Sequence, residues 1–208
     1  MKKIVYLIEF LFIKFLFIIF KFVGYKTASN LGFFIGKNFG NFFRKKKSII
    51  DNLNKSKISI DISDNQFANN VLGNYGRILA EYPYLKDFRK NKMEKFIKID
   101  GLENLNKIKN KKKPVVFISG HFNNFELMAM QIEKQGINLA AIYRPLNNIF
   151  LNKTMEHIRT KYICKNQIRK GRSGTRQILE NLKAGNSIAL MIDQRVTEGI
   201  KINFFGNL

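Results

Sequence analysis

A histidine and a glutamate five positions apart, His121 and Glu126, carry side chains suited to acid–base chemistry. They follow an apolar run ending at Ser119 and Gly120, which predicts a buried parallel strand. Beyond the histidine, apolar residues recur at helical spacing, so the imidazole is expected in a strand-to-helix turn. Open α/β sheets place ligand sites at the carboxyl ends of parallel strands, and imidazole titrates near neutral pH. The position therefore makes His121 a candidate for a chemical role.

The spacing of the pair leaves two interpretations open. On a continuous helix, five residues separate two side chains by about 140°, so His121 and Glu126 meet only if the backbone bends between them. Asn123 as the helix N-cap, with Gly120 permitting a tight turn, would supply that bend. Alternatively, Asn123 and Glu126 form a capping box, and His121 is a loop residue without a chemical role.

Four blocks of sequence carry a resemblance to a known family. H-F-N-N-F-E at 121–126 matches the H-x-x-x-x-(D/E) motif of the glycerolipid acyltransferase superfamily, and in its H-F-x-N-(aromatic)-E form resembles the lauroyl/myristoyl acyltransferases of lipid A biosynthesis. Phe125 stands where that family usually has Trp. Y-R-P at 143–145, D-Q at 193–194 and F-F-G at 204–206 follow in the family's order. The resemblance runs from about residue 49 onward and lacks roughly the last third of a typical member.

The resemblance implies an α/β fold with a mostly parallel central sheet flanked by helices, and an O-acyltransferase activity. His121 would be the general base and Glu126 the carboxylate that orients it. The donor would be an acyl carrier protein or coenzyme A thioester, and the acceptor a hydroxyl of a phosphorylated lipid A precursor. We expect no cofactor and no metal. The implied location is the cytoplasmic face of the cell inner membrane.

Further candidate residues for substrate binding lie at strand ends and in loops. Arg144 is the last residue of the predicted strand 137–144, and Asp193 and Gln194 follow the apolar strand 187–192. All three are therefore expected at the sheet edge that carries His121. Arg172 lies in the basic, glycine-rich loop 170–174, which opens a predicted helix at 175–183 and suits an anion. Donors to the developing oxyanion would be the backbone amides near Asn123 and Asn124 or the guanidinium of Arg144.

The first 43 residues predict a hydrophobic membrane-anchor region, followed by an acyltransferase domain over 44–208 that is truncated at its C-terminus. Residues 4–23 form an apolar stretch long enough to cross a bilayer, interrupted by Glu9, Lys14 and Lys21. Both a spanning helix and a helix lying in the interface fit this pattern. Glycines at every fourth position, Gly32, Gly36 and Gly40, indicate either close helix packing or shallow insertion.

The charge of the chain implies an anionic partner. Its 37 Lys and Arg against 15 Asp and Glu give a formal net charge of +22, which suits a phospholipid surface, an acidic protein or nucleic acid. No RNA-recognition, zinc-finger or basic-zipper pattern appears, so nucleic acid is not the expected partner. A single cysteine, Cys164, excludes an intrachain disulfide and a cysteine-rich zinc site. The rival functions are a glycerol phosphate or lysophospholipid acyltransferase and a noncatalytic basic membrane-binding protein.

Overall fold

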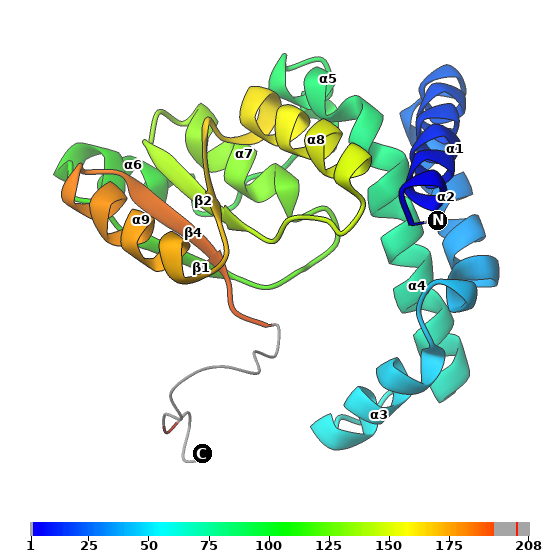
Figure 1. Ribbon diagram of the computed structural model, residues 1–208. Helices are drawn as coiled ribbons and strands as arrows, with labels where there is room; N and C mark the ends of the chain where they lie inside the picture. Colours follow the sequence, from blue (N-terminus) through cyan, green and yellow to red (C-terminus); the bar gives the residue numbers. More distant parts are fainter. Residues whose placement is uncertain (1, 194–202, 204–208) are drawn as a thin grey trace.

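A parallel four-stranded sheet forms the centre of the C-terminal half of the molecule (Figure 1). The computed structural model describes residues 2–193 and 203. The strands are β1 (Val116–Ser119), β2 (Leu139–Tyr143), β3 (Asn166–Arg169) and β4 (Ser187–Met191), in the order β1-β4-β2-β3. All three neighbouring pairs are parallel. The expected α/β fold with a parallel sheet flanked by helices is confirmed.

Helices cover both faces of this sheet. On one face, α9 (Arg172–Lys183) packs Ile178 and Leu182 over Ala140, Ile168 and Ile188. The opposite face belongs to the main core, which includes residues from α7 (Glu126–Lys134) and α8 (Ile149–Ile158). A π-helical turn at Arg159–Ile163 continues α8, and α6 (Leu102–Lys111) precedes β1. The crossover helices thus place every strand's carboxyl end at the same edge.

The strand before His121 is less buried than its apolar sequence predicts. β1 lies at one edge of the described sheet and pairs with β4. Val116 aligns with Ile188 and therefore shares its sheet face. However, α9 buries Ile188 while Val116 and Ile118 remain 49% and 62% exposed. The prediction of a parallel strand was right, and the prediction that this strand is buried was wrong.

The N-terminal half is helical. It consists of α1 (Lys2–Phe22), α2 (Tyr25–Phe39), α3 (Lys46–Ser56), α4 (Asp64–Glu81) and α5 (Leu85–Arg89). Three 3-10 turns accompany them, at Gly40–Phe42, Tyr82–Tyr84 and Glu94–Phe96. Ser63 caps α4 by accepting a hydrogen bond from the backbone N–H of Gln66. This cap fixes the start of the helix whose last residue, Glu81, bonds with Asn124 in the turn after β1.

Helices α2 and α4 pack through glycines on both sides. A Cβ atom added to Gly36 would lie 2.4 Å from the carbonyl oxygen of Leu72, and one added to Gly76 would lie 2.1 Å from that of Gly32. The glycine rhythm therefore serves close helix packing, as in small-residue interfaces generally. Phe20 and Ala28 also join the core that contains Tyr82 and Leu85. The segment 2–43 thus shares one hydrophobic core with the sheet domain.

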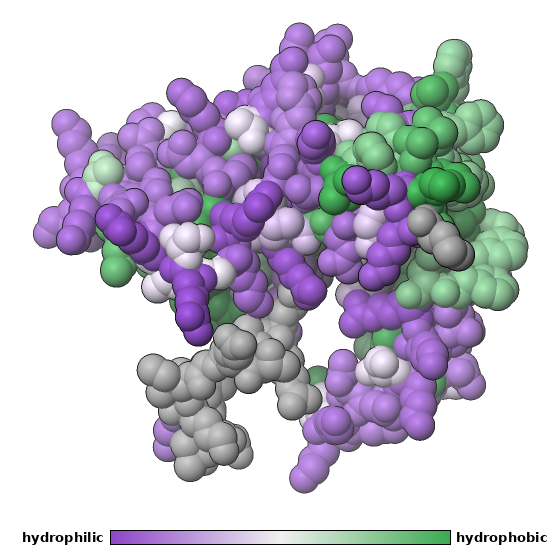
Figure 2. Space-filling view, viewed as in Figure 1, coloured by the Kyte–Doolittle hydropathy of each residue, from purple (hydrophilic) through white to green (hydrophobic). Residues whose placement is uncertain are grey.

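Helix α1 lies along the protein and keeps an apolar outer face. The Asn148 side-chain amide donates to the Tyr6 carbonyl at 2.8 Å and to the Glu9 carboxylate at 2.9 Å, so the acidic residue of this helix faces protein. Ten large apolar residues on the other side are at least 40% exposed: Ile4, Val5, Leu7, Ile8, Leu11, Phe12, Phe15, Ile18, Phe22 and Val23. Figure 2 shows this apolar surface over α1 and the adjoining part of α2.

The spanning form of the expected anchor is not supported. Within residues 2–193, no helix combines the length and the hydrophobicity needed to cross a membrane. The reason is visible in α1, where Lys2, Lys3, Glu9, Lys14 and Lys21 interrupt the apolar sequence.

Candidate active site

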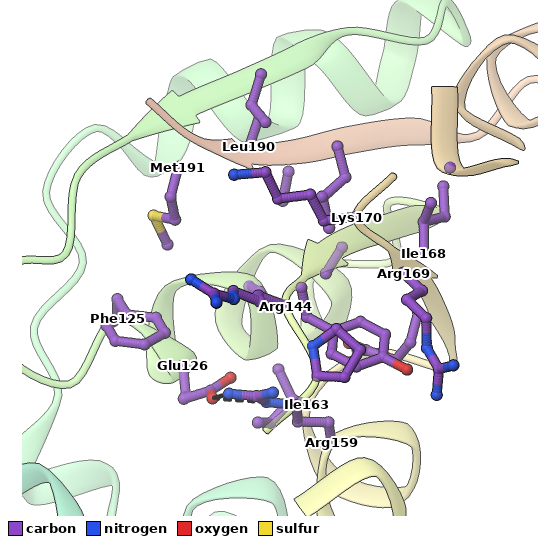
Figure 3. Close-up of a pocket in the computed structure, with 18 of the residues that line it drawn as sticks. Phe125, Glu126, Arg144, Arg159, Ile163, Ile168, Arg169, Lys170, Leu190 and Met191 are labelled. Carbon is purple, nitrogen blue, oxygen red and sulfur yellow. Dashed lines mark hydrogen bonds and ion pairs between the residues drawn. The ribbon is translucent and has the colours of Figure 1, made fainter. Parts of the chain in front are cut away.

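A cavity of about 770 Å³ lies over the carboxyl ends of the strands. His121 follows β1, Arg144 follows β2 and Lys170 follows β3, and all three line it. The deeper wall is apolar, with Ile78, Met128, Ile142, Ile163, Ile178 and Met191 among its residues. Figure 3 shows the basic side chains Arg144, Arg159, Arg169 and Lys170 around the same space. The cavity therefore combines an apolar lining with several cationic groups.

A tight turn carries His121. The Phe122 N–H donates to the Gly120 carbonyl and the Phe125 N–H donates to the Asn123 carbonyl, both at 2.9 Å. Asn123 has a φ of 43°, in the left-handed region that Asn tolerates better than most residues. Helix α7 begins after Phe125, which occupies the N-cap without a side-chain hydrogen bond. The expected N-cap at Asn123 was therefore wrong, and so was the capping box with Glu126.

Asp193 is the carboxylate beside His121. The imidazole Nδ1 lies 2.7 Å from Asp193 Oδ1, and the His121 backbone N–H donates to Oδ2 at 2.7 Å. Strand order explains the contact, because β1 and β4 are parallel neighbours and end at the same edge. Burial works against ionisation of Asp193, but the hydrogen bonds from His121 outweigh it and hold the pKa of this carboxyl below its usual value.

Glu126 has different partners from those expected. Its Oε1 accepts from Arg159 Nε at 2.8 Å, from Arg159 Nη2 at 2.7 Å and from the Tyr82 hydroxyl. The residue is only 6% exposed, and a buried carboxylate needs a cation nearby. The first turn of α7 thus directs Glu126 toward Arg159, while the Phe125 ring packs edge-on against the imidazole. The expected pairing of Glu126 with His121 is replaced by the pairing of Asp193 with His121.

The two partners of Glu126, Tyr82 and Arg159, both have raised pKa values. Burial raises the pKa of Tyr82, and the negative charge of Glu126 raises it further, so the phenol stays protonated and donates. Burial alone would lower the pKa of Arg159, but Tyr82 and Glu126 outweigh it and the pKa is raised. Arg159 therefore remains a cation on the cavity wall with its charge compensated by Glu126.

The remaining cations differ in whether a carboxylate compensates them. Arg169 pairs with Glu156 at 3.2 Å. None of the ion pairs formed within residues 2–193 involves Arg144 or Lys170, and Figure 3 shows Arg144 reaching into the cavity. These two cations are therefore the ones positioned for a bound anion.

Within the described residues, four predicted site residues do not line the cavity: Asn123, Asn124, Arg172 and Asp193. Arg172 is exposed at the first position of α9, and the basic loop instead brings Lys170 and Gly171 to the cavity. The Asn124 side chain donates to Glu81 Oε2 at 2.9 Å, so it serves the protein rather than a ligand. Gln194 and the F-F-G block at 204–206 lie outside the described residues.

Sequence reasoning missed Tyr82, Arg159 and Lys170. Arg159 had a detectable signal, because it lies four residues after Met155 on the apolar stripe of its helix, where a charge is costly unless it is paired. Lys170 lay within the loop that was singled out, next to the residue chosen. Tyr82 gave no chemical signal in the sequence, because an aromatic residue at the end of a helix usually packs in the hydrophobic core.

Comparison with known proteins agrees with this arrangement. The family model for bacterial lipid A biosynthesis acyltransferases matches residues 1–208. The chain belongs to this family. It is accordingly an acyltransferase, and the resemblance carried by the H-F-N-N-F-E turn is confirmed. A search of individually curated proteins found no significant match. The acyltransferase thus brings its family's histidine, in a strand-to-helix turn, to a cavity lined with cations.

Proposed function

We propose that this acyltransferase moves a fatty acyl chain from an acyl carrier protein or coenzyme A thioester to a hydroxyl of a phosphorylated lipid A precursor. One observation carries the proposal: a histidine bonded to a carboxylate stands at a cavity that is both apolar and cationic. An acyl chain requires the apolar wall. A phosphorylated acceptor and the phosphate of the carrier's prosthetic group both require the cations.

His121 serves as the general base in this mechanism. In neutral imidazole, an Nδ1–H that donates to Asp193 makes Nε2 the basic nitrogen. Nε2 takes the proton of the acceptor hydroxyl as its oxygen attacks the thioester carbonyl, which is typically worth about 10² to 10⁴ in rate. The Asp193 carboxylate stabilises the imidazolium. The tetrahedral intermediate then expels the thiolate, and the imidazolium returns the proton to sulfur.

The cations have separate roles. Arg144 is proposed to bind the developing oxyanion or the substrate phosphate, since it reaches into the cavity without a carboxylate partner among the described residues. Lys170, at the start of the loop before α9, is proposed to bind phosphate together with backbone amides of that helix end. Glu126 is assigned to holding Arg159 in the cavity wall, in place of orienting the base.

We further propose that the protein works on the cytoplasmic face of the inner membrane, with α1 lying in the interface. The exposed apolar face of α1 supports this location. On a helical wheel Lys3, Lys14 and Lys21 fall within about 20° of one another. They flank the apolar face, as expected of lysines that extend toward headgroups. The net charge of +22 adds attraction to an anionic bilayer and to an acidic carrier protein.

The first test is acyl transfer from a labelled thioester, supplied either on acyl carrier protein or on coenzyme A. We expect His121→Ala to lower turnover at least about a hundredfold, because the base is lost. His157→Ala is the matched control, because His157 is exposed on α8 away from the cavity lining, and its turnover should equal the wild type. Wild-type turnover in His121→Ala would rule out the mechanism. Preference for glycerol phosphate over a lipid A precursor would keep the chemistry and replace the acceptor.

A further inference from the structure

The turn that presents His121 is held from outside at three points. His121 bonds with Asp193, Glu126 bonds with Arg159 and Tyr82, and Asn124 donates to Glu81. The turn needs such support because Asn123 occupies a left-handed conformation, which costs on the order of 1–3 kcal/mol for a residue other than glycine. The contacts of His121 and Glu126 involve groups that line or flank the cavity. The contact of Asn124 reaches Glu81, which is outside the cavity lining.

Glu81 is the last residue of α4 and connects the turn to the N-terminal helices. Its Oε2 accepts from Asn124 at 2.9 Å, and its Oε1 accepts from the Ser29 hydroxyl of α2 at 2.8 Å. Ser29 in turn accepts from Arg77 at 3.1 Å. Glu81 is 5% exposed and Ser29 6% exposed, so these bonds lie away from solvent. The Glu81 carboxylate therefore joins α2 to the turn that carries His121, although these two segments are distant in the chain.

The chemistry of the carboxylate sets the orientation of the Asn124 amide. An ionised carboxylate only accepts hydrogen bonds, so both groups facing Glu81 must be donors. The charge of Glu81 also acts on the nearby phenol of Tyr25. Burial raises the pKa of Tyr25 to about 12, and the negative charge of Glu81 adds to that rise. Glutamine at this position would offer one oxygen and one NH₂ group. It could accept from Asn124 only with its NH₂ group turned toward the Ser29 hydroxyl, which already accepts from Arg77.

We propose that Glu81 is a positioning residue for catalysis, holding Asn124 and hence the His121 turn against α2. The proposal rests on the assignment of His121 as the base. It predicts that Glu81 affects turnover through the placement of the imidazole, since a displacement of about 1 Å at a reacting group can cost up to about a hundredfold in rate. Substrate binding, which uses the cavity cations and apolar wall, should change little.

The experiment compares four full-length proteins: wild type, Glu81→Gln, the exchange variant Glu81→Gln with Asn124→Asp, and Glu103→Gln. The exchange variant restores both hydrogen bonds, because glutamine at position 81 can donate to the new aspartate and accept from Ser29. Glu103 is exposed on α6 and controls for the loss of one negative charge. Two quantities are measured: the kinetic constants for acyl transfer, and hydrogen exchange of backbone amides 120–126.

We expect Glu81→Gln to lower kcat by about tenfold or more, with KM values for both substrates within about twofold of wild type. Exchange at 120–126 should rise by at least about tenfold, since a buried hydrogen bond to a charged group is lost. The exchange variant should recover both, and Glu103→Gln should change neither. Unchanged kcat and exchange in Glu81→Gln would overturn the proposal, as would failure of the exchange variant to recover.

Two further outcomes remain informative. If the wild type transfers no acyl group, the hydrogen-exchange result alone decides whether Glu81 holds the turn, and only the proposed function fails. If Glu81→Gln does not fold, Asn124→Ala removes the same hydrogen bond from the other side. It should show the same fall in kcat and rise in exchange, and wild-type values there would overturn the proposal.

Discussion

Two carboxylates near His121 have separate partners, and each partner defines what the carboxylate can do. Asp193 lies against Nδ1 of the imidazole, and its side chain is partly exposed. It can stabilise an imidazolium as the acceptor hydroxyl loses its proton. Glu126 is buried against Arg159 and Tyr82. The charge of Glu126 is needed to keep the Arg159 guanidinium in the cavity wall. Removing that charge should therefore mainly reduce the stability of the fold.

Substituting the two carboxylates by their amides should separate these roles. We expect Asp193→Asn to lower kcat at least about a hundredfold, because the charge that stabilises the imidazolium is lost. Its urea midpoint should remain near that of the wild type. Glu126→Gln should reduce the free energy of unfolding by about 3 kcal/mol, since it leaves Arg159 buried without a counter-charge.

Urea unfolding and steady-state kinetics on the same preparations decide between the two assignments. A Glu126→Gln protein that is fully stable but inactive, beside an active Asp193→Asn protein, would return the role of orienting carboxylate to Glu126.

At the scale of elements, α4 connects the two halves of the molecule. Its glycine face fits against α2, while Glu81 and the adjoining Tyr82 bond with the turn and with Glu126. Any change in the separation of α2 and α4 therefore acts at the end of α4 that supports the His121 turn. The position of α2 matters for the site even though α2 contributes no residue to the cavity lining.

Alanine at Gly36 should test this packing. The added Cβ would meet the Leu72 carbonyl at 2.4 Å, which is backbone and cannot rotate away. We expect a net loss of about 2 kcal/mol in the free energy of unfolding, despite the gain of about 1 kcal/mol in helix propensity. Asn38→Ala, on the exposed side of the same helix, should stay within about 0.5 kcal/mol of wild type. Stabilisation by Gly36→Ala would contradict the observed interface.

At the scale of the whole molecule, the apolar outer face of α1 and the positive charge of the chain both favour the same kind of partner. The outer face of α1 is apolar, lysines lie along its side, and the chain as a whole carries a charge of +22. A bilayer with anionic headgroups satisfies both features at once. Because residues 2–43 share a core with the sheet, point substitutions on the outer face test this better than deletion of the segment.

Flotation with vesicles that contain anionic phospholipid provides the measurement. Wild-type protein should stay bound through a high-salt wash, because burial of apolar side chains does not depend on screening. Replacing Phe12 and Phe15, which are 55% and 58% exposed, with Glu should weaken binding at least about a hundredfold. The matched control Leu179→Glu, 56% exposed on α9, should bind as wild type does. Release of the wild type by salt alone would refute an apolar attachment.

Local patterns in the sequence predicted elements well and contacts poorly. The apolar runs before His121 and Asp193 predicted β1 and β4, because runs of this kind belong to parallel strands. Which carboxylate meets His121 could not be read in this way. It depends on β1 and β4 being neighbours although His121 and Asp193 are 72 residues apart, and on the first turn of α7 facing inward. Only the fold supplies those two facts.

The hydrogen bond from Asn148 to Glu9 joins residues 139 positions apart and so has a consequence for synthesis. At about 5–20 residues per second, ~7–28 s pass between the addition of Glu9 and that of Asn148. Throughout that interval the newly made α1 lacks its contact with α8, and the face later turned toward protein is open as well. The helix is therefore available to a bilayer before it is available to its own sheet domain. If the protein works at the membrane, as we propose, attachment can begin on the ribosome, and the domain then completes its fold beside the bilayer.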